Sequence, residues 1–222
     1  MNNDKVYEKS INCPVCGKDT KIQAPKKSSC KMGRKDSDFN QNYEGINFLF
    51  YGIDFCNECG YAALPSYFKS IKDNQKHLIK NSISTKWKKN TYEDEYTVDD
   101  AIQQHKLALL NAVVKESSSG EKALICLKLS WLYRNKEEKN SELRFQEQTI
   151  LGFEKAYQKE PLPIGGLDNW HLLYLLGELH RRTGNHSKAL NFFSQVVSST
   201  QAPAKLKEKI RDARDLMKEQ VI

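Results

Sequence analysis

Four of the six cysteines lie in two pairs of the form Cys-x-x-Cys, and each pair is followed by a glycine. Two residues between the cysteines let the backbone curl so that both sulfurs face one point, and glycine tolerates the positive φ that this curl requires. Two such pairs supply four thiolates, the tetrahedral ligand set that Zn²⁺ takes in structural sites. The spacing therefore predicts one structural Zn²⁺ held by Cys13, Cys16, Cys56 and Cys59.

Other uses of paired cysteines fit this sequence less well. A thioredoxin-like redox pair needs one Cys-x-x-Cys that opens a helix after a strand. Disulfides need an oxidising compartment, and residues 1–5 carry no apolar run that would export the chain. A nucleobase deaminase needs a His-x-Glu motif, which does not occur. Because four sulfurs leave no open position for water, we expect a structural rather than a catalytic metal.

The length and composition are those of a globular protein. Of the 222 residues, 39% are hydrophobic and 28% are charged. This length allows one medium domain or two small ones whose core needs no disulfides. No run of about 18 consecutive apolar residues occurs, so the sequence predicts no membrane span. Without an apolar leader, we expect a cytoplasmic protein.

Charge is distributed unevenly along the chain. Residues 1–90 hold 16 Lys or Arg and 9 Asp or Glu, whereas residues 91–100 hold five acidic residues and no basic one. A basic N-terminal part followed by an acidic hinge indicates a domain boundary. We therefore expect a zinc-ribbon-like module at 1–63, a basic connecting helix and acidic hinge at 64–96, and a helical domain at 97–222.

Strands are expected around both cysteine pairs. A short strand within residues 1–12 would lead into the first pair, and Asp19–Ala24 would return as the second strand of a ribbon. Pro25–Asp38 is rich in Lys, Ser and Gly, which is typical of an exposed loop. Ile46–Phe55 is aromatic and β-prone, so it is predicted to be the strand that enters the second pair.

A basic helix is expected after the second pair. Apolar residues recur there at helical spacing and would form one buried stripe: Leu64, Phe68, Ile71, Leu78 and Ile79. Four lysines lie beside this stripe: Lys69, Lys72, Lys76 and Lys80. The simplest interpretation is a solvated flank that covers the edge of the core. The alternative is a nucleic-acid-binding surface, to which Lys86, Trp87, Lys88 and Lys89 would add.

The two remaining cysteines have separate interpretations. Cys30 lies among basic residues of the expected loop and is most simply a surface thiol. Because positive neighbours favour the thiolate, a redox-responsive cysteine is an alternative, and so is an additional or exchanged metal ligand. Cys126 lies in an apolar helical run and is interpreted as a small buried hydrophobic residue.

From residue 97 onward the pattern is helical. Asp99 and Asp100 would occupy the first turn of a helix that runs to about Glu116, where acidic groups suit the positive end of the helix dipole. Further helices are expected over Ala123–Tyr133 and around Leu143–Tyr157. If Trp170 is the first position of a tetratricopeptide unit of about 34 residues, six residues stand at the expected offsets: Leu173, Leu176, Gly177, Gly184, Ala189 and Phe193.

These patterns together predict a mainly α fold. A small N-terminal, β-containing zinc ribbon with four cysteine ligands would be followed by tetratricopeptide-like antiparallel helical hairpins. A less regular copy of the repeat begins near Leu129, and Pro203 begins a final amphipathic helix that would cap the stack. Short side chains such as Gly177 matter here, because two antiparallel helices approach closely only where side chains are small.

Several motifs of the N-terminal part occur in a characteristic order. They are Cys13-Pro14-Val15-Cys16-Gly17, the basic loop with Asp36-Ser37-Asp38, and an aromatic segment that enters Cys56-Asn57-Glu58-Cys59-Gly60-Tyr61-Ala62-Ala63. Over roughly residues 5–215, this order resembles the bacterial family catalogued as domain of unknown function 2225. The resemblance implies a cysteine module followed by tetratricopeptide-like helices, and it implies no particular activity.

The sequence contains no catalytic constellation. It has no Gly-rich phosphate loop, no nucleophile elbow and no His-Glu-x-x-His, and its histidines do not pair at metal-ligand spacing. We therefore expect a non-enzymatic adaptor or scaffold that binds a protein or peptide partner, or a second copy, through its helical domain. Aromatic residues available for a concave face are Trp131, Tyr133, Trp170 and Tyr174, most of which suit a core better. Nucleic-acid binding by the basic N-terminal half and redox sensing through Cys30 are the alternatives.

Overall fold

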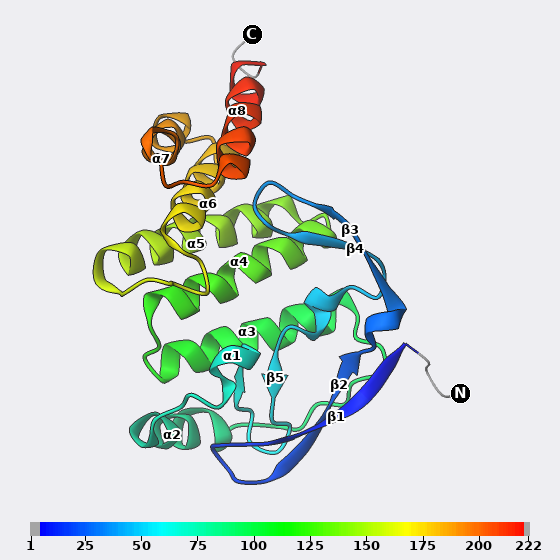
Figure 1. Ribbon diagram of the computed structural model, residues 1–222. Helices are drawn as coiled ribbons and strands as arrows, with labels where there is room; N and C mark the ends of the chain where they lie inside the picture. The colour runs from blue at the N-terminus through cyan, green and yellow to red at the C-terminus, as the bar shows by residue number, and fades with distance from the viewer. Residues whose placement is uncertain (1–4, 220–222) are drawn as a thin grey trace.

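Three antiparallel hairpins form the N-terminal part of the structure, a computed structural model that describes residues 5–219 (Figure 1). Each hairpin is a separate two-stranded sheet. The strand pairs are β1 (Val6–Asn12) with β2 (Asp19–Pro25), β3 (Cys30–Lys35) with β4 (Gln41–Gly45), and β5 (Asp54–Phe55) with β6 (Ala62–Ala63). The expected return strand at Asp19–Ala24 is confirmed. Each cysteine pair occupies the turn of a hairpin, the first between β1 and β2 and the second between β5 and β6.

The segment predicted as an exposed loop, Pro25–Asp38, is instead largely structured. It contains a 3₁₀ turn, η1 (Lys27–Ser29), and the whole of β3. All residues of β3 after the first are exposed, so the strand has no hydrophobic alternation that would identify it. The end of the segment is also not exposed, because the side chain of Asp38 is completely buried.

The strand predicted over Ile46–Phe55 is wrong for most of its length. A 3₁₀ turn, η2 (Phe48–Tyr51), occupies its centre, and only its last two residues are extended in a sheet. The side chain of Asn47 accepts a hydrogen bond from the Leu49 N–H at 3.0 Å. Because such local bonds compete with strand ladders, Asn47 ends the extended path that the aromatic residues favour.

The single basic helix predicted from Leu64 onward is divided into three short elements. They are α1 (Pro65–Phe68), α2 (Asp73–Ile79) and a π-helical turn, η3 (Lys80–Ser84). The Tyr61 hydroxyl donates to the carbonyl of Phe68 at 2.9 Å and so occupies an acceptor that a continuing helix would use. The helix starts again where the Lys72 N–H donates to the side chain of Gln75 at 3.1 Å.

Six longer helices make up the rest of the described chain, which confirms a mainly α fold with small N-terminal hairpins. They are α3 (Val98–Val114), α4 (Ser119–Asn135), α5 (Lys139–Lys159), α6 (Asn169–Arg182), α7 (His186–Ser198) and α8 (Ala204–Glu219). Asp99 and Asp100 lie in the first turn of α3 as expected. Thr97 and Asp100 form a capping box, in which the Asp100 N–H donates to the Thr97 hydroxyl at 3.2 Å.

The helices stack in chain order, with the hairpins along one edge of the stack (Figure 1). Three clusters of buried side chains follow the same order. The first joins the cysteine hairpins to α3 and α4, the second lies among α4, α5 and α6, and the third lies among α6, α7 and α8. The tetratricopeptide-like character of these helices stays a prediction. In the part of the chain that the structure describes, no helix has the length and apolar character needed to cross a membrane.

Candidate metal centre

The four predicted cysteine ligands lie together although the two pairs are far apart in sequence. All four Sγ atoms are within 4.8 Å of one another. Across the two pairs, the Cys13 and Cys59 sulfurs are 3.6 Å apart and the Cys16 and Cys56 sulfurs are 3.7 Å apart. Four sulfurs placed tetrahedrally at about 2.3 Å from a zinc ion are about 3.8 Å from one another. A disulfide would need a separation of about 2.05 Å, so the spacing fits a tetrahedral thiolate site.

The two cysteine turns have matching backbone geometry. In each turn, the N–H of the glycine after the second cysteine donates to the carbonyl of the first cysteine at 2.9 Å. Gly17 and Gly60 adopt φ values of 74° and 75°, in the left-handed region where glycine has no steric penalty. The expectation that these glycines take positive φ is therefore confirmed. The same curl presents both sulfurs of a pair to the centre of the cluster.

Hydrogen bonds within the cluster stabilise a thiolate there. Hydrogen bonds from Cys13 and then Cys59 lower the pKa of the Cys56 thiol strongly. The pKa of Cys13 is raised first by its hydrogen bond to Cys56, and that of Cys59 first by its hydrogen bond to Cys13. Cys13, Cys56 and Cys59 are buried and Cys16 is partly exposed. Because the sulfurs share protons, a divalent cation could replace those protons and hold the four groups as thiolates.

The second cysteine turn is held by two side chains whose role there the sequence did not indicate. The side chain of Asn111, in α3, donates to the carbonyl of Gly60 at 3.0 Å. The indole N–H of Trp87 donates to the carbonyl of Asn57 at 2.8 Å. The Trp87 ring covers Gly60 so closely that an added Cβ there would lie 2.7 Å from it. Trp87 therefore packs on the cysteine turn, although the alternative interpretation placed it on a nucleic-acid-binding surface.

A half-buried acidic residue connects the two cysteine turns. Glu58 forms ion pairs with Lys18, which follows the first turn, at 3.2 Å and with Lys89. The hydrogen bond from Lys89 is the main reason that the pKa of Glu58 lies below its ordinary value. These contacts place positive groups beside the cluster, where four thiolates and one divalent cation would leave two negative charges.

The other candidate residues of the N-terminal half do not form a shared site. Cys30 begins β3, is half-buried and lies outside the cysteine cluster. The four lysines of the predicted basic face do not follow one helix, because Lys69 ends α1 and Lys72 precedes α2. Lys76 pairs with Asp73 at 2.8 Å. Nucleic-acid binding and redox sensing stay predictions.

A cluster of charged groups around the buried Asp38 lies between the tip of the β3–β4 hairpin and the helices. The guanidinium of Arg134, in α4, donates to Asp36 at 2.9 Å, to Asp38 at 2.5 Å and to Glu142 at 2.7 Å. Burial opposes the charge on Asp38, but the hydrogen bond from Arg134 and the charges of Arg182 and Arg134 hold its pKa below the usual range. The carboxylate is therefore ionised, and it fastens the hairpin to the helical stack.

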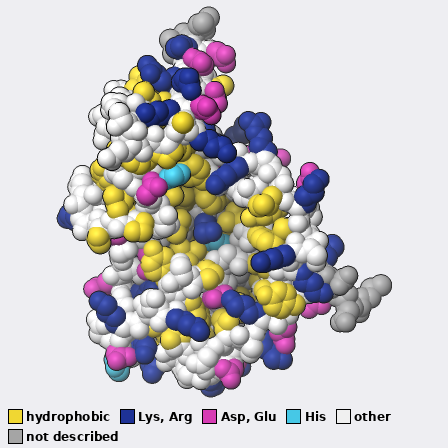
Figure 2. Space-filling model, viewed as in Figure 1, with side chains coloured by type: hydrophobic (Ala, Val, Ile, Leu, Met, Phe, Trp, Pro, Cys, Tyr) yellow, Lys and Arg dark blue, Asp and Glu magenta, His cyan; other side chains and the backbone are white. Residues whose placement is uncertain are grey.

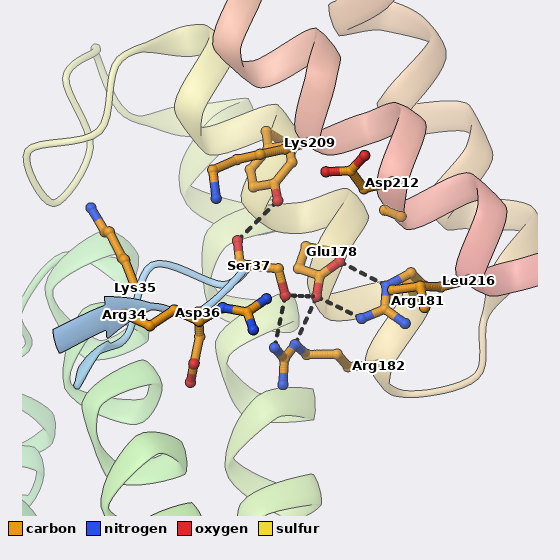
Figure 3. Close-up of a pocket in the computed structure, with 12 residues that line it drawn as sticks. Arg34, Lys35, Asp36, Ser37, Glu178, Arg181, Arg182, Lys209, Asp212 and Leu216 are labelled. Carbon is orange, nitrogen blue, oxygen red and sulfur yellow. Dashed lines mark hydrogen bonds and ion pairs between the residues drawn. The ribbon is translucent and has the colours of Figure 1, made fainter.

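A second buried carboxylate adjoins this cluster. Glu178, in α6, is fully buried and accepts hydrogen bonds from Arg181 and Arg182 at 2.8 Å and from the Ser37 hydroxyl at 2.6 Å (Figure 3). The Tyr174 hydroxyl donates to the Ser37 carbonyl at 3.0 Å. The sequence signal for this cluster was Asp36-Ser37-Asp38, whose acidic residues stand out in a basic segment.

The hairpins, the cluster of four cysteines and the helical stack define a mainly α protein with an N-terminal cysteine module. Residues 6–217 match the family model described as "Uncharacterized protein conserved in bacteria (DUF2225)", so the chain belongs to this family and the resemblance is confirmed. A protein of Borreliella burgdorferi described as "Uncharacterized protein" is 26% identical over 170 residues, covering 68% of this chain and 61% of that protein. The chain thus spans about three fifths of the length of that curated relative. No solved structure gives a significant match.

Proposed function

We propose that the chain is a non-enzymatic protein-interaction module held together by one structural Zn²⁺. The observation that carries the metal assignment is the placement of the Cys13, Cys16, Cys56 and Cys59 sulfurs within 4.8 Å of one another. A set of four sulfurs at tetrahedral spacing, three of them buried, suits zinc, and iron is the other metal that takes such a set. With all four positions filled by sulfur, the ion would have no open position for a substrate.

The metal would serve the fold by joining two separate hairpins. The β1–β2 turn and the β5–β6 turn would each contribute two thiolates, so the ion would connect Cys13 to Cys59 across the first buried cluster. Zinc binding contributes on the order of 10 to 16 kcal/mol in isolated finger modules. The short β5–β6 hairpin has only two residue pairs of its own, so we expect it to depend on the metal and on α3.

The exposed surface of the helical stack supports an interaction role. Val113 in α3 and Leu151 in α5 are 56% and 60% exposed, and both line a groove beside Phe145. Clustered apolar groups on a surface are typical of places where another protein binds. A short helical stack also leaves end surfaces that a partner or a second copy would cover.

Elemental analysis of purified protein tests the metal assignment. We expect about one equivalent of zinc in wild-type protein prepared without chelators. The double variant Cys56→Ser, Cys59→Ser should lose it, because two oxygens replace two thiolates. The variant Cys30→Ser is the matched control and should keep the full equivalent. Less than about half an equivalent in wild-type protein whose four thiols are free would contradict the assignment.

The interaction role has its own test. Immobilised wild-type protein should retain a defined partner from native lysate. Alternatively, the purified chain should self-associate, which light scattering would detect. The Cys56→Ser, Cys59→Ser variant identifies capture that depends on the metal-bound fold. A stable monomer that retains nothing beyond this variant would contradict an adaptor role.

A further inference from the structure

Two neighbouring cavities form one groove between the tip of the β3–β4 hairpin and helices α6 and α8. Their volumes are about 280 Å³ and about 420 Å³. Lys35 of the hairpin and Lys209 of α8 line both cavities, so the two cavities adjoin at these two lysines. Figure 2 shows hydrophobic side chains gathered where α4, α5 and α6 lie in Figure 1, with Lys and Arg beside them. We refer to the smaller cavity as the polar half of the groove and to the larger one as the apolar half.

The wall of the polar half contains carboxylates that are already hydrogen-bonded. Glu178 is completely buried there, and the side chains of Arg181, Arg182 and Ser37 hold it in place (Figure 3). Asp36, which also lines this half, is bound by Arg134 at 2.9 Å. Both carboxylates therefore already have cationic partners and would not neutralise further cations in the groove.

The groove carries excess positive charge. Among the described residues, no carboxylate forms an ion pair with Arg34, Lys35, Lys205 or Lys209, all of which line one or both halves. Asp212 is the remaining acidic residue in the lining. A groove with unpaired cations on both sides attracts an anionic ligand and repels a cationic one.

The apolar half is shaped by a strained aromatic residue. Phe39 adopts a φ of 72°, in the left-handed region that is uncommon for a bulky side chain. Its ring lies 5.3 Å from that of Tyr174 and 5.1 Å from the Lys35 ammonium group. Leu167, Leu206, Pro203 and the ring of His171 also line this half. The volume of about 420 Å³ exceeds what an inorganic anion would fill and accommodates an apolar side chain.

The length of the groove sets the size of its ligand. Lys205 and Leu216 mark its two ends on α8, and eleven residues of helix span about 16 Å. An extended peptide covers this distance with about four to five residues. We propose that the groove binds an extended acidic peptide segment of a partner protein. Its carboxylates would pair with Lys35 and Lys209, and one apolar side chain would occupy the apolar half beside Phe39.

This proposal rests on the interaction role and specifies the class of partner. The probe is a fluorescein-labelled peptide, Asp-Glu-Leu-Asp-Glu-Phe, titrated with the full chain and followed by fluorescence anisotropy. We expect saturable binding that weakens with added salt. The double variant Lys35→Glu, Lys209→Glu should bind at least about tenfold more weakly, because two ion pairs become repulsive contacts.

Two controls separate this site from general electrostatic attraction. The double variant Arg211→Glu, Arg214→Glu makes the same charge change at exposed positions of α8 that line neither cavity, and should stay within about twofold of wild type. A second peptide, Asp-Glu-Ser-Asp-Glu-Ser, lacks the apolar side chains and should bind at least about fivefold more weakly.

The outcomes distinguish the two proposals. Equal binding by the groove variant and wild type, or equal affinity for both peptides, would overturn the acidic-peptide site. Zinc content is measured in every variant, so a folding defect at the cysteine cluster is recognised. Full zinc without peptide binding would reject the groove alone, and peptide binding without zinc would reject the metal assignment alone.

Discussion

His105 is fully buried in α3 and has a neutral ring. Burial lowers its pKa to about 3, with a further contribution from the charge of Lys128. Its Nδ1 lies 2.7 Å from the carbonyl of Ala101, so this nitrogen carries the proton and donates it. The neighbouring Gly52 leaves room for the ring, since a Cβ there would lie 3.1 Å from the imidazole Nε2.

The buried neutral His105 predicts acid destabilisation at mild pH. The unfolded chain binds a proton at about pH 6.5, whereas the folded chain binds it only near pH 3, so stability falls as the pH drops through this interval. From pH 7 to pH 5, His105 alone should lower the free energy of unfolding by about 2 kcal/mol. Urea unfolding at several pH values measures this loss.

Substitution separates the effect of His105 from that of other titrating groups. His105→Gln should flatten the dependence of unfolding free energy on pH between 7 and 5, whatever its absolute stability. His77→Gln changes an exposed histidine of α2 and should leave the dependence as in wild type. An unchanged slope in His105→Gln would show that the group does not titrate as expected.

Among individual residues, the sequence identified those whose chemistry depends on their spacing along the chain. The cysteines were identified because each turn places both sulfurs with only two intervening residues. Asp38 could not be placed, because its partner Arg134 lies 96 residues away and joins it only in the folded chain. The packing of Trp87 on Gly60 could not be predicted for the same reason, since this contact depends on the path of the chain through η3.

Among the elements, helices α6 and α7 meet at a glycine. An added Cβ on Gly177 would lie 2.6 Å from the ring of Phe193, which is 1% exposed. The predicted need for a small side chain at this position agrees with this contact. The Phe193 ring has no room to move aside, so the close approach of the two helices depends on Gly177.

Gly177→Ala should destabilise the chain despite the higher helix propensity of alanine. Propensity favours alanine by about 1 kcal/mol, whereas overpacking in a filled core costs about 1 to 3 kcal/mol. We expect a net loss of up to about 2 kcal/mol in urea unfolding followed by circular dichroism. In a Phe193→Leu background the added methyl has space, and the same change should be neutral or stabilising. Equal effects in both backgrounds would contradict this packing argument.

The elements that the sequence predicted well are those with a long hydrophobic period. Helices α3 and α5 to α8 have apolar faces that repeat over several turns, and α4 is apolar on nearly all sides, so their existence followed directly from the pattern. The short elements near the cysteines were decided by single contacts. Asn47 turns the chain into η2, and the Tyr61 hydroxyl ends α1. Neither contact produces a periodic pattern of hydrophobic residues in the sequence.

In the whole molecule, the cysteine cluster and the helices share one core. The first buried cluster includes Cys13, Cys56 and Cys59 together with Ala108 of α3 and Leu129 of α4. The boundary proposed between residues 63 and 97 therefore crosses a continuous apolar contact. The division into three segments stays a prediction.

Removal of a metal held by the four cysteines should therefore weaken the entire chain. We expect a chelator to lower the midpoint of one cooperative thermal transition by roughly 10 °C or more. Structural zinc contributes on the order of 10 kcal/mol in isolated fingers, and 1 kcal/mol shifts a chain of this size by about 2 to 4 °C. Circular dichroism at the helix band follows the transition.

The control for chelation is the variant that lacks two ligands. Cys56→Ser, Cys59→Ser should already unfold at the lower temperature and should not respond to the chelator. If the helices of wild-type protein melt at the same temperature with and without chelator, their stability is independent of the metal.

The three tryptophans report on three different parts of this arrangement. Trp87 covers the second cysteine turn, Trp131 donates to Asp38 at 3.1 Å, and Trp170 packs at the edge of the last helical cluster. Replacing Trp131 and Trp170 by phenylalanine would leave one fluorophore beside the sulfurs. The emission of that single indole would follow metal exchange in real time in a stopped-flow instrument, with no external dye attached to the chain.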